Sequence, residues 1–314
     1  MIKNDSNSDN YFDNENVTKA STKSIPKKHK LNAVGVDDTI RLINDDIGDG
    51  NLNASSLTYL VKSDNYVAVN GSNQIVEHFW KKSGVKLHTE HFLDGLNCVD
   101  KHWMASSSAQ GKKEKFDAVI FTQPVPQYIN FHSPEGRPDG NYLDIMKENK
   151  KIFELLEKVK YYSSFSLGIM YNETQTLALD WTVKYFPNNK ILRYVCVDSL
   201  RRGRPLEPTS ILVQTQRTWS EENLHLDKHD ACPILLTELK EQIGELPEPD
   251  HVFPHRWRYS QTAAPFSGSP GAIVLHDSPL LIGAGDSFAV SNVEGCLYSA
   301  KVAAGLIERK LVTN

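Results

Sequence analysis

The sequence contains few cysteines, and none of them lie close together. Its 314 residues include four, Cys98, Cys196, Cys232 and Cys296, which form no CxxC motif. Disulfide scaffolds and most cysteine-based zinc sites use closely spaced cysteines. We therefore expect no disulfide framework, and we interpret the four residues as reduced thiols in a reducing compartment.

Long apolar runs and a strong charge of one sign are also missing. No run of about 18 consecutive apolar residues occurs, so we expect no transmembrane helix and no membrane partner. The N-terminus, MIKNDSNSDNYFDNEN, lacks the apolar core of a signal peptide. We expect a cytoplasmic location and leave open secretion without a signal peptide. A formal net charge of −4 gives no basic field, so nucleic acid is not an expected partner.

Large apolar side chains are sparse in residues 1–56, where Asn, Asp, Ser and Lys dominate. Such a segment buries too little apolar surface to offset the chain entropy that folding removes. We therefore predict a disordered or atypical region over 1–56. The whole sequence is 39% hydrophobic and 24% charged, which is typical of a globular protein with one large domain or two ordinary ones.

Two segments with an α/β pattern flank a block of different character. Residues 66–92 predict a strand, a helix capped by Ser72 and ended by Gly84, and a second strand. A polar loop is expected over 106–115. The apolar run 116–122 predicts a strand that is buried on both faces and ended by Pro124 and Pro126.

The middle block alternates apolar and polar residues, as half-buried antiparallel strands do. Strands are predicted over 165–171, 191–197 and 211–215, and a helix over 147–161. A second helix is predicted to begin near Pro233 and to end at Gly244. The block therefore indicates an α+β domain inserted between pieces of an α/β domain.

The segment most informative about chemistry is 279–294. A buried strand over 279–283 runs into Gly285-Asp286, and residues 291–294 form a capping-box pattern that begins a helix. Glycine lets the backbone approach a ligand, and a helix N-terminus favours negative charge. The pattern suits a dinucleotide at the carboxyl end of a strand. An ordinary strand–turn–helix, with glycine serving only the turn, is the alternative.

This segment, PLLIGAGDSFAVSNVEGCLYSAKVAAGLI, resembles the C-terminal flavin motif of amine-oxidase-like flavoproteins. The chain more specifically resembles the renalase family. The motifs YVAVNGSNQIVEHFWKKSGVKLHTEH, KFDAVIFTQPVPQ, YSSFSLGIMY, KILRYVCVDSLRR and HRWRYSQ follow one another in that family's order. The resemblance covers most of residues 66–307, and the shared order is more specific than any single motif.

The resemblance implies a fold that combines α/β and α+β parts. It comprises an FAD-binding Rossmann-like domain, incomplete at its N-terminus, with an inserted antiparallel-sheet substrate domain. The FAD-binding domain would consist of 57–135 and 262–314, and the substrate domain of 136–261.

The resemblance also implies where FAD binds. Asp286 would bond the ribityl chain, amides near Asn292 would face the flavin pyrimidine edge, and Phe92 or Leu93 would lie by the adenine. Thr122 and Pro124 would end the strand beside the dinucleotide. The implied cofactor-binding residues are Phe92, Leu93, Thr122, Pro124, Gly285, Asp286, Asn292, Val293 and Glu294.

Four further residues match positions in the substrate domain or near the flavin, and they are the catalytic candidates: Tyr185, Arg193, Trp257 and Tyr259. Members of the family oxidise dihydro isomers of NAD(P)H by hydride transfer to the flavin and pass the electrons to oxygen. The expected partners are therefore a nicotinamide dinucleotide and oxygen, and the expected products are NAD(P)+ and hydrogen peroxide. No metal is implied, and the sequence does not indicate the oligomeric state.

The sequence departs from the family because the fingerprint GxGxxG is absent. Gly48-Asp49-Gly50 follows no apolar strand, and the segment 283–288 lacks the third glycine. The missing unit supplies a central strand and the pyrophosphate site, so its loss should weaken both folding and FAD affinity. A fragment, a shortened isoform and a divergent member without FAD stay open, as does a binding or signalling protein on this fold. A conventional amine oxidase is a third functional class.

The pair His88 and His91 could indicate a metal site. On a strand, however, residues three apart point to opposite faces. We therefore predict that these histidines belong to a solvated polar edge.

Overall fold

The computed structural model describes residues 17–19, 33–34, 66–68, 70–107, 110–129, 142–179 and 181–312. The chain divides into two compact units, and it passes between them after Leu87 and within two long strands. Unit 1 contains the described residues through Leu87 together with Ser164–Trp257, and unit 2 contains His88–Ser163 and the chain from Arg258 onward. The region predicted over 1–56 lies outside the described residues, apart from β1 (Val17–Lys19) and β2 (Ala33–Val34).

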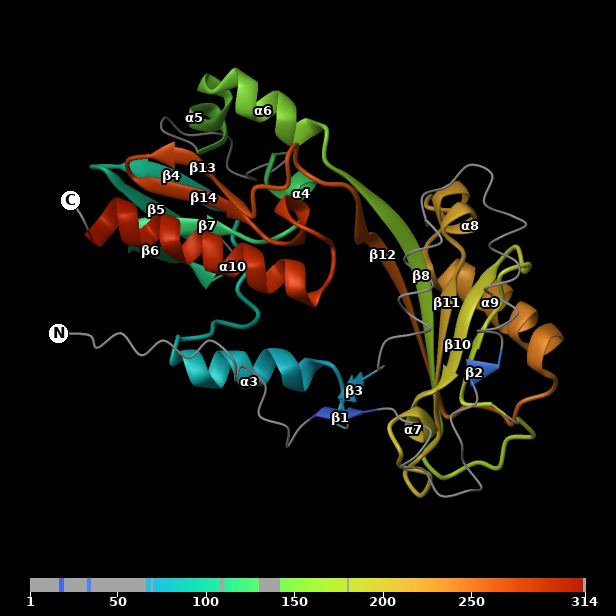
Figure 1. The fold of residues 1–314 in the computed structure, drawn as a ribbon. Coiled ribbons are helices and arrows are strands. Elements are labelled where there is room, and N and C mark those ends of the chain that lie inside the picture. Colours follow the sequence, from blue (N-terminus) through green and yellow to red (C-terminus); the bar gives the residue numbers. More distant parts are fainter. Residues whose placement is uncertain are drawn as a thin grey trace. The chain divides into compact units, whose positions relative to one another are not determined.

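Unit 1 is organised around a six-stranded sheet (Figure 1). The strand order is β12-β8-β11-β10-β9-β2, in which β8, β11, β10 and β9 pair antiparallel and β2 pairs parallel to β9. The added strands are β8 (Lys160–Met170), β9 (Val183–Tyr185), β10 (Leu192–Val197), β11 (Ser210–Thr215) and β12 (His251–Ala264). The predicted strands of the middle block are confirmed to within a few residues at most ends.

One face of this sheet is covered by α9 (Lys228–Ile243). Leu235 and Leu239 of the helix pack in one core with Phe165, Leu167 and Val213 of the sheet. The helix begins five residues before Pro233, because the Asp227 side chain accepts a bond from the backbone of His229 and so caps it. The prediction of its start was therefore wrong, whereas its end at Gly244 is confirmed.

Shorter elements complete unit 1: β3 (Tyr66–Ala68), α3 (Asn73–Ser83), α7 (Asp198–Arg201) and α8 (Arg217–Glu222). The helix α3 ends at Gly84, whose φ of 67° is one that glycine adopts easily. Ser72 precedes the helix but makes no capping bond. The strand predicted after this helix is not formed, because the described chain offers residues 85–91 no neighbouring strand.

Unit 2 contains a three-stranded sheet of order β13-β14-β7. Its strands are β7 (Ala118–Phe121), β13 (Ala272–Asp277) and β14 (Leu280–Ala284), with β7 and β14 parallel. The buried strand predicted over 279–283 is confirmed by β14, which is buried throughout. The strand predicted over 116–122 is shorter, and Ile120 is 40% exposed because β7 has no neighbour beyond it in the described sheet.

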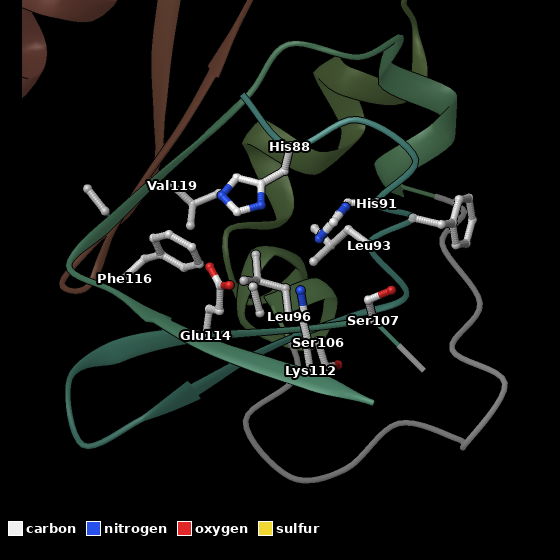
Figure 2. A pocket seen from close by; sticks show the side chains of 13 residues that line it. His88, His91, Leu93, Leu96, Ser106, Ser107, Lys112, Glu114, Phe116 and Val119 are labelled. Carbon is white, nitrogen blue, oxygen red and sulfur yellow. The ribbon is translucent and has the colours of Figure 1, made fainter. Parts of the chain in front are cut away.

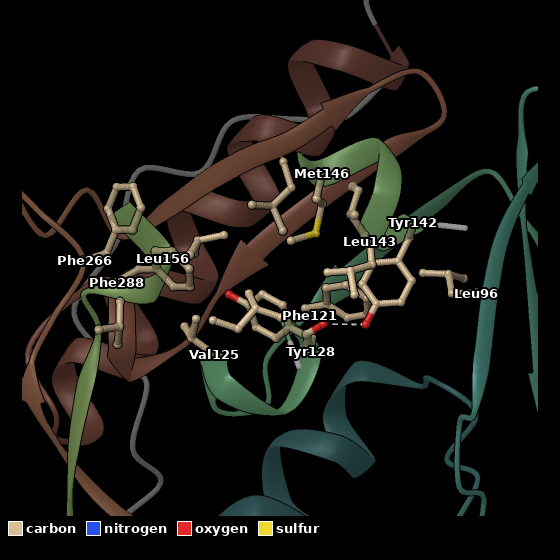
Figure 3. Packing of buried hydrophobic residues seen from close by; sticks show 14 of the residues in the cluster. Leu96, Phe121, Val125, Tyr128, Tyr142, Leu143, Met146, Leu156, Phe266 and Phe288 are labelled. Atoms are coloured by element: carbon tan, nitrogen blue, oxygen red, sulfur yellow. Dashed lines mark hydrogen bonds between the residues drawn. The ribbon is translucent and has the colours of Figure 1, made fainter. Parts of the chain in front are cut away.

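Both faces of β14 are covered. On one face, α10 (Val293–Ile307) packs Ala303 against Leu280 and Ile282. The other face belongs to a core shared by α4 (Val125–Ile129), α5 (Tyr142–Glu148) and α6 (Lys150–Glu157). Figure 3 shows part of this core, in which Phe121 stacks on Tyr128 and the Tyr142 hydroxyl donates to the Tyr128 carbonyl over 2.6 Å.

The helix predicted over 147–161 is divided in two. Asn149 separates α5 from α6, and its side chain accepts a bond from the Ile152 backbone at the start of α6. Both helices had been predicted within the substrate domain, but Leu143, Met146 and Leu156 pack in the core of unit 2. The helix α3, predicted within the FAD-binding domain, lies in unit 1. The units therefore change at 163/164 and 257/258 rather than at 135/136 and 261/262.

A three-stranded antiparallel sheet also lies in unit 2, formed by β4 (Gly95–Val99), β5 (His102–Ser107) and β6 (Lys112–Phe116). The polar loop predicted over 106–115 is wrong, since Ser107 pairs with Lys112 and the two strands form a hairpin. Polar side chains are compatible with β6 because it is an exposed edge strand. A 3₁₀ turn at Asp286–Phe288 and a π-helical turn at Glu308–Val312 complete the unit.

None of the described helices is long and apolar enough to cross a membrane.

Candidate cofactor site

The carboxyl ends of the parallel strands β7 and β14 are brought together by Gly285. The backbone φ of this residue is 116°, and a Cβ atom there would lie 3.3 Å from the carbonyl oxygen of Thr122. A larger residue would therefore be strained, and glycine lets the chain leave β14 beside the end of β7. The structure thus unites two of the predicted residues, Thr122 and Gly285, at the sheet end where ligands bind in α/β folds.

Asp286 follows directly and is held by two hydroxyl groups. Its Oδ2 atom accepts bonds from Ser291 Oγ at 2.6 Å and from Thr262 Oγ1 at 3.0 Å. Its Oδ1 atom has no recorded partner in the part of the chain that the structure describes. The carboxylate is thus fixed in place through one oxygen, while the other can accept a bond from a ligand hydroxyl. Sequence patterns gave no signal for Thr262.

The N-terminus of α10 lies just beyond this carboxylate. Asn292 caps it, because Asn292 Oδ1 accepts a bond of 2.7 Å from the backbone of Gly295. The capping box predicted over 291–294 is therefore not formed. Asn292 alone caps the helix, because the Ser291 hydroxyl donates to Asp286 instead. Val293 is 53% exposed and Val290 is 66% exposed, so apolar side chains lie open beside a helix end with free amides.

Behind the turn, Tyr161 joins three segments of unit 2. Its hydroxyl bonds Ser287 Oγ at 2.6 Å and accepts a bond of 3.0 Å from the Val125 backbone. Burial raises the pKa of Tyr161, and the negative charge of Asp286 raises it further. The ring meets that of Tyr259 edge to face at 5.3 Å. The candidate Tyr259 thus lies close to this network, in which Tyr161 and Ser287 were not predicted.

Phe92 and Leu93 lie elsewhere in unit 2, in the lining of two cavities. One has a volume of about 370 Å³ and the other of about 540 Å³, and both are also lined by Val119 of β7. Figure 2 shows the smaller cavity. Phe92 is 71% exposed, so its ring is available to a ligand. Pro124 lines neither cavity and instead accepts a backbone bond from Gln127 at the start of α4.

His88 and His91 also line the smaller cavity, and their ring centroids are 5.0 Å apart (Figure 2). The prediction that they point to opposite faces was wrong, because residues 88–91 form no strand. A search of the described residues finds no group of three side chains suited to a metal.

The remaining candidates lie in unit 1, on the sheet face opposite α9. The register places Ser166, Gln214, Tyr194 and Tyr185 in one row across four strands, and residues paired in this way share a face. Trp257 Nε1 donates to Ser166 Oγ at 2.9 Å, which ties the indole to the end of the row. The sheet thus brings Trp257 and Tyr185 to one polar and aromatic row.

Arg193 lies next to this row in β10. Burial and the positive charge of Arg217 lower the pKa of Arg193, whereas burial raises the pKa of Tyr185. Arg193 is half-buried, and partial burial strengthens the attraction of an arginine for an anion.

The fold is similar to that of solved amine and protoporphyrinogen oxidases. A crystal structure from Exiguobacterium sp. 255-15, described as a protoporphyrinogen oxidase, matches with a TM-score of 0.55 at 15% identity, over 81% of this chain and 55% of that one. The cyclohexylamine oxidase of Brevibacterium oxydans IH-35A matches with a TM-score of 0.53 at 10% identity, over 77% and 53%. The chain thus spans about half the length of these structures.

Among proteins of known function, the chain is similar to renalase of Mus musculus. The two are 28% identical over 238 residues, which are 75% of this chain and 67% of the mouse protein. No family model matches the chain. The similarity to renalase confirms the predicted resemblance, and the solved structures confirm the predicted fold class.

The described residues fit one side of an FAD site. The free oxygen of Asp286 suits a ribityl hydroxyl, and the capped start of α10, with exposed Val290 and Val293, suits a flat ring edge that carries negative charge. The pyrophosphate side is different. Within the described ranges, no turn with the GxGxxG pattern connects a strand to a helix beside β7 or β14.

Proposed function

We propose that this chain provides the flavin-binding and substrate-sheet parts of a renalase-type FAD-dependent oxidoreductase. The observation that carries the proposal is the Asp286 carboxylate, fixed by Thr262 and Ser291 between the end of β14 and the start of α10. A core strand, a capped helix and a hydroxyl pair all serve to hold one carboxylate that leaves an oxygen free. Such an arrangement suits a ligand with sugar-like hydroxyls.

In this proposal the protein positions the flavin and polarises it. Asp286 Oδ1 accepts a bond from a ribityl hydroxyl, and the amides of Val293 and Glu294 face the pyrimidine edge, where the helix end stabilises negative charge. Val290 and Val293 limit the access of water to that edge. When bound, FAD supplies the hydride-accepting chemistry.

The proposed substrates are dihydro isomers of NAD(P)H, with oxygen as the electron acceptor. The net reaction converts one dihydronicotinamide, one oxygen molecule and one proton into NAD(P)+ and hydrogen peroxide. Similarity to renalase supports this choice. The row that contains Tyr185 and Trp257 offers aromatic surface, and Arg193 offers a cation for a phosphate group.

A catalytically impaired protein that binds or signals through the same fold is the second candidate. Within the described sheet β7 has a partner on one side only, and the sequence lacks the GxGxxG fingerprint; both features favour this candidate. Those two features weaken the phosphate side of the proposed cofactor site and leave the surroundings of Asp286 unchanged.

Turnover with added FAD distinguishes the two candidates. We expect the purified chain, given FAD and a dihydronicotinamide isomer, to consume oxygen and to form hydrogen peroxide in equal amounts. Ordinary NADH serves as the control substrate and should react far more slowly. If FAD binds but neither oxygen uptake nor peroxide is seen, the oxidase proposal fails and the binding protein is favoured.

The variant Asp286→Ala tests the residue that carries the proposal. Loss of the ribityl bond should lower flavin occupancy by roughly tenfold or more, because a hydrogen bond to a charged group contributes about 1.5–3 kcal/mol. The variant Asp277→Ala, which removes a carboxylate at the other end of the β13–β14 hairpin, is the control. Full flavin occupancy in Asp286→Ala would refute the ribityl role.

A further inference from the structure

An irregularity in β10 places Arg193 beside the aromatic row of unit 1. The pairing of β10 with β11 shifts between Leu192 and Tyr194, so Arg193 is an extra residue at a β-bulge. In a regular strand Leu192 and Tyr194 would share a face, because side chains alternate. Here Leu192 is buried in the core that α9 covers, whereas Tyr194 belongs to the row on the opposite face. Bulges re-aim side chains in this way and are common next to functional sites.

Arg193 is a half-buried cation without a carboxylate partner among the residues that the structure describes. No ion pair recorded there involves it, whereas the nearby Arg201 is bound by Asp198 at 2.5 Å. The groups that shift the pKa of Arg193 besides its burial are Arg217, which begins α8, and Tyr185. A half-buried cation close to a second positive charge is unfavourable until an anion joins it. Arg193 is therefore suited to an anionic ligand.

Aromatic rings lie at both ends of the row beside Arg193. At one end, the rings of Tyr185 and Tyr194 meet edge to face at 5.1 Å. At the other end, Trp257 Nε1 donates to Ser166 Oγ over 2.9 Å. Tyr185 is 39% exposed and Trp257 is 49% exposed, so a ligand can reach both rings.

The distance between these aromatic ends follows from the strand order. The row crosses β9, β10, β11 and β8, and three strand spacings of about 4.8 Å separate its ends by about 14 Å. The row therefore suits an extended ligand with two separate ring systems, one of which lies near the cation Arg193.

The charge of the anion follows from the two arginines. Each phosphate of a pyrophosphate bridge carries one negative charge, whereas a phosphate monoester carries about −1.5 to −2 at neutral pH. The more highly charged group suits the combined positive charge of Arg193 and Arg217, and the planar guanidinium binds two phosphate oxygens at once. Among the proposed substrates, the NADP form alone has a monoester, on the 2′ position of the adenosine ribose.

We propose that Arg193, aided by the charge of Arg217, binds the 2′-phosphate of the dinucleotide and makes the substrate sheet prefer the NADP form to the NAD form. The adenine then lies by Tyr185 and Tyr194, and the nicotinamide lies toward Trp257. This inference rests on the proposed substrate class and adds a preference within it.

The test compares NADP+ with NAD+, which differ only in the 2′-phosphate, by isothermal titration calorimetry of the full chain without FAD. We expect NADP+ to bind roughly tenfold more tightly, because hydrogen bonds between charged groups are stronger than neutral ones. Arg193→Met should remove this difference by weakening NADP+ alone. Arg193→Lys keeps the charge but loses the planar fork, so it should retain part of the difference.

A matched control comes from the other face of the same sheet. Lys184 in β9 pairs with Val195, which lies in the core with α9, so the two residues share the face opposite the row. Lys184→Met removes the same charge and should leave the ratio of the two affinities unchanged. An excess of FAD should not displace NADP+, since the proposed flavin residues belong to unit 2.

Five results would overturn the proposal. They are no binding of NADP+ at millimolar concentration, equal affinities for NADP+ and NAD+, a preference that survives in Arg193→Met, the same loss in Lys184→Met, and displacement of NADP+ by FAD. These titrations need no flavin, so their outcome is distinct from that of the turnover experiment. A preference for NADP+ without turnover would refute the oxidase proposal alone, and turnover with equal affinities would refute the phosphate site alone.

Discussion

Two strands that each contain consecutive apolar residues, β11 in unit 1 and β7 in unit 2, differ in their surroundings. β11 pairs on both sides, with β8 and β10, and its Ile211 is 2% exposed. β7 pairs only with β14 in the described sheet, its Ile120 is 40% exposed, and both cavities of unit 2 reach it. The sheet of unit 1 is thus enclosed on both sides of β11, whereas the sheet of unit 2 is enclosed only on the side of β14.

The same difference separates the two sides of the proposed cofactor site, the ribityl and pyrimidine side and the phosphate side. Asp286, Asn292 and the start of α10 lie where β14 is buried on both faces, so the proposed ribityl and pyrimidine side rests on a complete core. The open edge of β7 is where a neighbouring strand and its glycine turn would supply the phosphate side. We therefore expect residues near β14 to matter more for stability than those near the β7 edge.

The largest expected effect is a difference in unfolding free energy between two Phe→Ala variants, one in each unit. Phe165→Ala in the unit 1 core should cost about 3–5 kcal/mol of unfolding free energy, because it leaves a cavity in a buried cluster. Phe116→Ala should cost less than about 1 kcal/mol, because Phe116 is 41% exposed whereas Phe165 is 1% exposed. Urea unfolding followed by circular dichroism measures both values. Similar losses in the two variants would show that the β7 side is packed as closely as the unit 1 core.

A smaller effect concerns the helix caps of the two units. Asn292→Ala should lower the unfolding free energy by about 1 kcal/mol, because the Gly295 amide loses its partner. Ser72→Ala, at the start of α3 in unit 1, is the matched control and should change stability by less than about 0.5 kcal/mol, since Ser72 makes no capping bond. Thermal unfolding of both variants checks the pair. An equal or larger loss in Ser72→Ala would contradict the assigned caps.

The smallest effect concerns the charge of Asp286. Burial raises the pKa of Cys296, and the negative charge of Asp286 raises it further, whereas burial alone raises the pKa of Cys232 in unit 1. Asp286→Asn removes the charge, so the pKa of Cys296 should fall and more thiolate should be present at a given pH. Alkylation of Cys296 by iodoacetamide at pH 8 should then be on the order of twofold faster.

Peptide mass spectrometry separates the two cysteines in that experiment, and Cys232 serves as the internal control. Its alkylation rate should not respond to Asp286→Asn. A Cys296 rate that stays constant or falls would contradict the electrostatic coupling between Asp286 and Cys296.

The sequence predicted the parts of the fold that are determined locally. The strand ending at Gly285-Asp286 and the helix after it follow from buried periodicity, a glycine turn and capping residues. The identity of the capping residue could not be predicted in this way, because both Ser291 and Asn292 are good capping residues. Only the tertiary bond between Ser291 and Asp286 decides between them.

The incorrect predictions all concern segments whose structure depends on the partners that pack or pair with them. Residues 85–91 have a strand pattern but no described neighbour to pair with, and the polar residues 112–116 form a strand because β5 supplies the backbone bonds. The same holds for the site, since Thr262 and Tyr161 lie far from Asp286 and Ser287 in the sequence. Polar residues of this kind give no pattern that identifies them before the fold brings them together.

The equilibrium binding of FAD to the purified chain tests the central claim most directly. We expect added FAD to bind, with quenching of its fluorescence and a raised melting temperature, and we expect Asp286→Ala to weaken both effects while the fold persists. A colourless protein whose melting temperature does not change with FAD would contradict the account.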